Sequence, residues 1–149
     1  MERRKFLSLG ALAAVAAVPS TLSAIDYRKE KPDTWKAHKV EPAIEKLYGK
    51  VKLIEEGVKV KTPDVAANGG AIPIDITSKI AAKSVALLQD ANPESTVAVW
   101  TVPENGIVDY SLKIKMQGSG TVTAIVEGLD GKYYVARKTL QVALGGCEG

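Results

Sequence analysis

The chain has 149 residues, with 20 Lys or Arg and 17 Asp or Glu side chains, and a formal net charge of +3. Without the first 24 residues, 17 basic and 16 acidic side chains remain, so the charge balance does not indicate nucleic acid as a partner. A chain of this length forms one domain with a core that needs no disulfide. A single histidine, His38, and a single cysteine, Cys147, exclude a metal site made of several His and Cys ligands within one chain.

Residues 1–24 have the pattern of an export signal. Arg3 and Arg4 stand just before Phe6 and Leu7, and an alanine-rich apolar run at 9–18 follows that is too short to span a bilayer. Adjacent arginines are typical of the twin-arginine type, which is read by a receptor. We therefore expect cleavage between residues 20 and 24, a periplasmic protein and no stable membrane insertion afterwards. An uncleaved N-terminal anchor is the alternative.

Residues 25–40 are polar around Trp35 and predict an extended lead-in. A short helix is predicted at 41–48, because Pro42 suits a first turn, Ile44 and Leu47 share one face, and Gly49 can end the helix.

The pattern after Gly49 is that of β-strands separated by turns. Alternating or β-branched segments lie at 58–60, 72–76, 84–88, 96–102, 112–116, 121–126 and 132–142. Asp130-Gly131 is a hairpin signal, and Pro73 indicates an edge or irregular strand. About seven short strands with little helix predict an all-β fold, an immunoglobulin-like antiparallel β-sandwich that with the helix covers residues 41–142. A small barrel is the alternative.

Two further patterns have simple structural interpretations. The glycine-rich stretches at 68–70 and 118–120 precede no helical pattern, so they predict turns and not phosphate-binding loops. Lys113 and Lys115 are expected on the solvated side of a strand, with a docking surface for anionic cargo or partners as the alternative.

The C-terminal residues 143–149 carry the strongest functional signal. Cys147 follows Gly145 and Gly146 and precedes Glu148 and Gly149 at a chain end, which predicts a thiol on a flexible arm and not a core residue. From Ala143 the arm can extend about 15 Å at roughly 3.3 Å per residue. That length suffices to place a small group in another protein's cleft.

The surroundings of Cys147 favour a carrier over a catalyst. A reactive thiolate is favoured by a histidine, a cation or a helix N-terminus, whereas Glu148 and the terminal carboxylate are negative. Mobile glycines also oppose the fixed geometry that catalysis needs. We therefore expect no catalytic residue and no metal, and a thiol that other proteins load and unload.

Two alternatives stay open at this point. An odd cysteine in an exported protein often pairs between chains, which would make the protein an interaction module that dimerises through its tail. An enzyme that uses Cys147 with His38 is the second, although His38 stands among lysines and is expected to be a solvated surface residue.

The chain resembles the SoxY-type sulfur-carrier subunit of the periplasmic Sox thiosulfate-oxidising system. The features that carry the resemblance run in order through the chain: the twin-arginine signal, Ala66-Ala67-Asn68-Gly69-Gly70-Ala71-Ile72-Pro73-Ile74, Asn92-Pro93, Lys113-Ile114-Lys115-Met116, Asp130-Gly131 and Gly145-Gly146-Cys147.

The resemblance implies an immunoglobulin-like fold, a heterodimer with a small SoxZ-type β-sandwich subunit, and sulfur intermediates bound covalently to Cys147 with no other cofactor. It also implies a haem enzyme that joins thiosulfate to the thiol, a hydrolase that releases sulfate, and partners that oxidise the remaining sulfur. One position departs from the family pattern, because Glu148 stands where the family tail typically has glycine.

Overall fold

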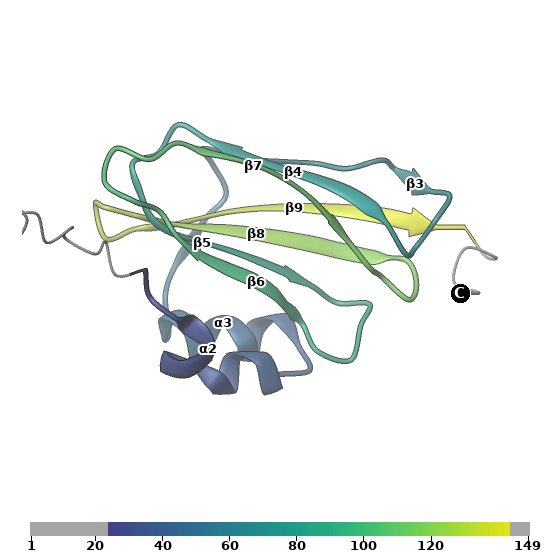
Figure 1. Cartoon of the computed structure of the whole chain (residues 1–149), viewed down its shortest axis with the longest axis horizontal. Helices are drawn as coiled ribbons and strands as arrows, with labels where there is room; N and C mark the ends of the chain where they lie inside the picture. Colours follow the sequence, from purple (N-terminus) through teal and green to yellow (C-terminus); the bar gives the residue numbers. More distant parts are fainter. Residues whose placement is uncertain (1–23, 144–149) are drawn as a thin grey trace, which may run out of the picture.

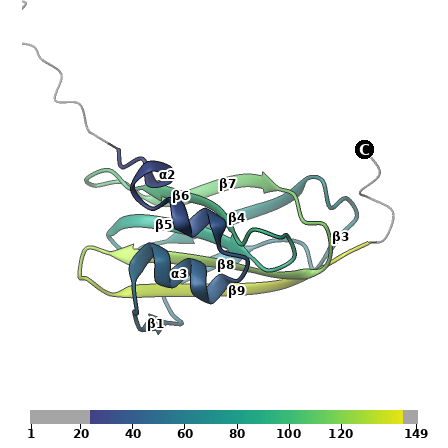
Figure 2. The same ribbon diagram turned by 90° about the horizontal axis from the view of Figure 1, so that it is seen from below.

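In the computed structural model, which describes residues 24–143, two β-sheets pack face to face and a layer of helices covers one of them from outside (Figures 1 and 2). The helical elements come first in the chain: α2 (Tyr27–Glu30), the 3₁₀ helix η1 (Pro32–Lys36) and α3 (Val40–Tyr48). The strands follow: β1 (Leu53–Ile54), β2 (Val58–Lys61), β3 (Val65–Ala66), β4 (Ile72–Ser78), β5 (Ala82–Gln89), β6 (Thr96–Thr101), β7 (Val108–Ile114), β8 (Gly120–Gly128) and β9 (Tyr133–Val142).

The larger sheet has the strand order β1-β9-β8-β5-β6, with β3 also paired to β9, and the smaller sheet has the order β2-β4-β7. This arrangement confirms the predicted immunoglobulin-like sandwich. Each of the seven predicted segments overlaps a strand, but the segment predicted at 112–116 is strand Val108–Ile114 in the structure. The short strands β1 and β3 were not predicted. Both pair with β9 in parallel, whereas the other pairs are antiparallel, so the sandwich is not purely antiparallel.

The main core lies between the two sheets. The isoleucines of β4 are fully buried there and alternate with Pro73, Asp75 and Thr77, as the period of two predicts. They meet Val85 and Leu87 of β5 and the inward-facing residues of β8. A second cluster forms where α3 covers the other face of the same strands.

Strands β5 and β8 are therefore buried on both faces. Ala86, Leu88 and Ile125 point away from the main core and pack against Ile44 and Leu47 of α3. Figure 2 shows α3 lying on this outer face of the larger sheet. The helix ends as expected at Gly49, whose φ of 80° favours glycine.

Two sequence expectations need correction. Residues 25–40 are not extended, because Asp26 caps α2 by accepting a hydrogen bond from the Lys29 N–H and Pro32 starts η1. Strand β4 is not an edge strand, but β2 pairs with it only from Asp75 to Ser78. Pro73 thus lies where β4 has β7 as its one partner, so its missing N–H breaks no pair with β2.

The double burial predicts a measurable stabilisation by α3. Replacement of Leu47 by alanine should lower the free energy of unfolding by about 2–5 kcal/mol, because the buried side chain leaves a cavity against β5 and β8. The neighbouring exposed residue gives the control, since Lys46→Ala should change it by no more than about 0.5 kcal/mol. Urea unfolding measures both, and equal effects would contradict a packed helical layer.

Candidate functional site

The residues predicted to carry the function lie outside the described part of the chain. These are Cys147 with Gly145, Gly146, Glu148 and Gly149, and the signal arginines Arg3 and Arg4. The structure does describe the platform from which the C-terminal residues continue. We call this platform the exit end: the last residues of β9, strand β3, and the connections β3–β4, β5–β6 and β7–β8.

Both edges of β9 are held up to its last residues. On one edge, Gln141 N–H donates to the Asp64 carbonyl at 2.8 Å and Ala143 N–H donates to the Ala66 carbonyl at 2.9 Å. On the opposite edge, Val142 N–H donates to Ser119 Oγ at 2.9 Å. In Figure 1, β3 lies beside the end of β9. The backbone is therefore fixed as far as Ala143, four positions before Cys147.

Burial and charge hold β3 in this place. Ala66 is buried in the main core, and Val142 packs against the same core. Lys138 of β9 donates a hydrogen bond to the Asp64 carboxylate and forms an ion pair with it. The hydrogen bond, together with the lysine charge, holds the pKa of the Asp64 carboxyl below its usual range. Because Asp64 is exposed, we expect this ion pair to add little to the free energy of unfolding.

Hydrogen bonds from side chains and backbone join the three connections of the exit end to one another. Asn92, in the β5–β6 connection, donates to the Lys115 carbonyl at 2.7 Å and accepts from Gln117 N–H at 2.9 Å. Gln117 in turn donates to the Ala91 carbonyl at 2.8 Å. The β3–β4 connection joins through Gly69, whose carbonyl accepts from Met116 N–H at 2.9 Å. The end of the sandwich is thus a bonded unit and not a set of free loops.

Three of the four described segments that carry the sequence resemblance lie at this end of the sandwich. Residues 66–74, Asn92-Pro93 and residues 113–116 all belong to the exit end or lead into it, whereas Asp130-Gly131 forms the β8–β9 hairpin turn. The stretch at 68–70 is a connection between strands, as predicted, and the stretch at 118–120 lies in the β7–β8 connection up to Gly120, where β8 begins. The sequence did not single out Asp64, Ser119 or Lys138, because each acts through a partner distant in the chain.

His38 is exposed, as expected, and its Nδ1 lies 2.8 Å from the Pro93 carbonyl. Within residues 24–143, no three His, Cys, Asp or Glu side chains form a group that could hold a metal ion. No helix in the same part of the chain is both long and apolar enough to cross a bilayer.

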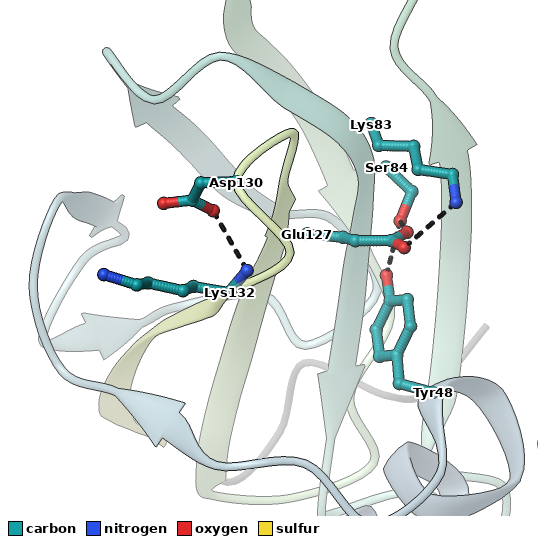
Figure 3. Close-up of polar contacts among 6 residues, drawn as sticks. All are labelled: Tyr48, Lys83, Ser84, Glu127, Asp130 and Lys132. Atoms are coloured by element: carbon teal, nitrogen blue, oxygen red, sulfur yellow. Dashed lines mark hydrogen bonds and ion pairs between the residues drawn. The ribbon is translucent and has the colours of Figure 1, made fainter.

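A second polar cluster joins the end of α3 to β5 and β8, and sequence reasoning missed it. Tyr48 OH lies 2.8 Å from Ser84 Oγ, and Ser84 Oγ donates to the Glu127 carboxylate at 2.6 Å. Lys83 also lies beside the Glu127 carboxylate (Figure 3). Burial is the main cause that raises the pKa of Tyr48, so the phenol stays neutral. Nearby, the Lys132 N–H donates to Asp130 in the hairpin turn. The cluster satisfies polar groups under a helix end, which is a structural role.

Comparison with solved structures gives the same fold in two kinds of protein. The sulfur carrier protein SoxY from Chlorobium limicola f thiosulfatophilum is 24% identical, with 70% of this chain and 96% of that chain covered and a TM-score of 0.64. Superoxide reductase (neelaredoxin) from Ignicoccus hospitalis is 15% identical, with 59% and 81% covered and a TM-score of 0.53. Both likenesses concern the fold. Among curated proteins, none matches this chain.

The comparison with family models is specific. The model described as "Sulfur oxidation protein SoxY" matches residues 44–147, from α3 through the sandwich and the exit end to the single cysteine. The match covers more than half of the chain and includes the segments that carry the sequence resemblance, apart from the twin-arginine signal, which lies before residue 44. This chain belongs to the SoxY family of sulfur oxidation proteins.

Proposed function

We propose that this protein is a sulfur carrier that holds thiosulfate-derived sulfur on Cys147 and presents it to the enzymes of a Sox system. The observation that carries the proposal is the extent of the family match, which ends at residue 147 and so includes the cysteine. The solved SoxY structure with the same fold is described as a sulfur carrier protein, which supports the same role.

The geometry of the exit end supports a carrier whose thiol is activated by its partner proteins. The bonded platform fixes the chain to Ala143, and Cys147 lies within about 15 Å of it by chain length. The carrier therefore supplies a thiol within a limited distance of a fixed point, and its partners supply the activation of that thiol. This protein is accordingly the substrate-bearing partner in a multienzyme system and not itself an enzyme.

The proposed loading step forms one bond. The cysteine sulfur joins the outer sulfur of thiosulfate, the thiol proton is released, and two electrons pass to a haem-containing loading enzyme. A hydrolase then uses water to break the bond to the sulfonate group, which releases sulfate and leaves a persulfide on Cys147. Further partners oxidise or transfer that sulfur.

The setting of these steps is also part of the proposal. Arg3 and Arg4 direct the protein through the twin-arginine pathway to the periplasm, where the signal is removed. There it pairs with a SoxZ-type small β-sandwich subunit. The immunoglobulin-like sandwich of this chain supports such pairing, since β-sandwich surfaces commonly serve as binding modules.

The intact mass of the exported protein tests the carrier function. After exposure to thiosulfate and its loading partners, the protein should gain a sulfur-containing adduct that a thiol reductant removes. The Cys147→Ala variant, exported and treated in the same way, should gain none. An unmodified monomer, or a dimer linked through Cys147 as the only product, would instead support the interaction module.

Replacement of His38 tests the enzyme alternative. The His38→Ala variant should acquire the adduct at the unchanged rate, because His38 is an exposed residue bonded to the Pro93 carbonyl. The rate of adduct formation is measured by mass at successive times. A loss of about a hundredfold, the usual size of a general-base contribution, would assign His38 a part in the chemistry.

A further inference from the structure

We propose that residues 144–149 dock in a groove between β6 and β7, so that the tail has a resting place on its own domain. The inference deepens the proposed carrier function and rests on it for the role of Cys147. It adds a state in which the thiol is shielded between encounters with partners.

The groove is the open side of the sandwich. Strands β6 and β7 are edge strands of the two sheets, and within the described residues neither pairs with the other. Val97 of β6 and Leu112 of β7 pack against the main core but stay partly exposed, and both line the groove. These two side chains give the groove an apolar floor, against which a polarizable sulfur atom can pack.

The groove lies beside the exit end. Asn92 lines it and is bonded to Gln117, which is two positions from Ser119, the partner of Val142 N–H. The path from the end of β9 to the groove thus crosses one connection. In the order β9-β8-β5-β6, three strand spacings of about 4.8 Å separate β9 from β6, and the tail's reach of about 15 Å from Ala143 matches that span.

Charge complementarity selects the tail as the occupant. Lys113 and Lys115 line the groove, are exposed, and form no ion pair with any residue between 24 and 143. The tail brings the Glu148 carboxylate, and a bound sulfonate would add a second negative charge. Glu94 also lines the groove and opposes them, so the two lysines leave a small positive excess.

Disulfide trapping tests where the tail lies, and it requires no bound sulfur. Val97→Cys places a thiol in the groove. Val99→Cys gives the matched control, because Val99 is equally part-exposed on the same strand but packs against the helical cluster on the other face. Diamide takes up the two protons and two electrons that disulfide formation releases. In its presence, the Val97→Cys protein should form an intramolecular disulfide with Cys147 about tenfold faster than the Val99→Cys protein.

Charge reversal tests the role of the lysines. In the Val97→Cys protein, Lys113→Glu with Lys115→Glu should lower the rate of disulfide formation to that of the Val99→Cys protein. Lys59→Glu with Lys61→Glu should leave it unchanged, because these exposed lysines of β2 lie away from the groove. Equal trapping at 97 and 99, or trapping that ignores the reversal at 113 and 115, would overturn the proposal. The mass experiment on the unmodified chain reports separately on sulfur loading, so failure of one is distinguishable from failure of the other.

Discussion

The hydrogen bonds on both edges of β9 are the constraint on which the rest of the structure depends. Strand β8 holds one edge along nearly its whole length, and the parallel partners β1 and β3 hold the two ends of the other edge. Because Ala143 still bonds to Ala66, the chain leaves the domain at a fixed place. Everything proposed for the C-terminal cysteine starts from that point, since position and chain length together set the space that the thiol can explore.

The two-sided burial of β5 and β8 makes this support firm. One face of these strands packs in the sandwich core and the other beneath α3, so neither β8, which pairs with β9, nor β5 beyond it can shift without opening two apolar clusters. The polar cluster of Tyr48, Ser84 and Glu127 closes the helix end onto these strands without leaving their polar groups unpaired. In contrast, no helix among the described residues covers the outer face of the smaller sheet, where Lys59 and Lys61 are exposed.

Much of the fold could be predicted from the sequence, because its main signals are local. The period of two in β4, the Asp-Gly turn before β9 and the Pro-to-Gly span of α3 all act over a few residues, and the structure confirms them. The capped turn at Asp26 was local too but was overlooked among polar residues. The strands β1 and β3 could not be predicted, since two residues carry no period and their pairing with β9 is long-range. The same reason hides Ser119 and Lys138, whose roles exist only after folding. For Cys147 the sequence alone supplied the candidate.

The parallel pairing of β3 with β9 also has a mechanical consequence. In the proposed carrier role, a partner that draws the tail into its cleft would pull along β9, and the hydrogen bonds of a ladder lie across the strand direction. Such a load shears all the bonds at once, where a pull across the strand would peel them one by one. The hydrogen bonds along β9 therefore share a load applied at its C-terminal end, so that the strand resists being pulled out of the sheet from that end.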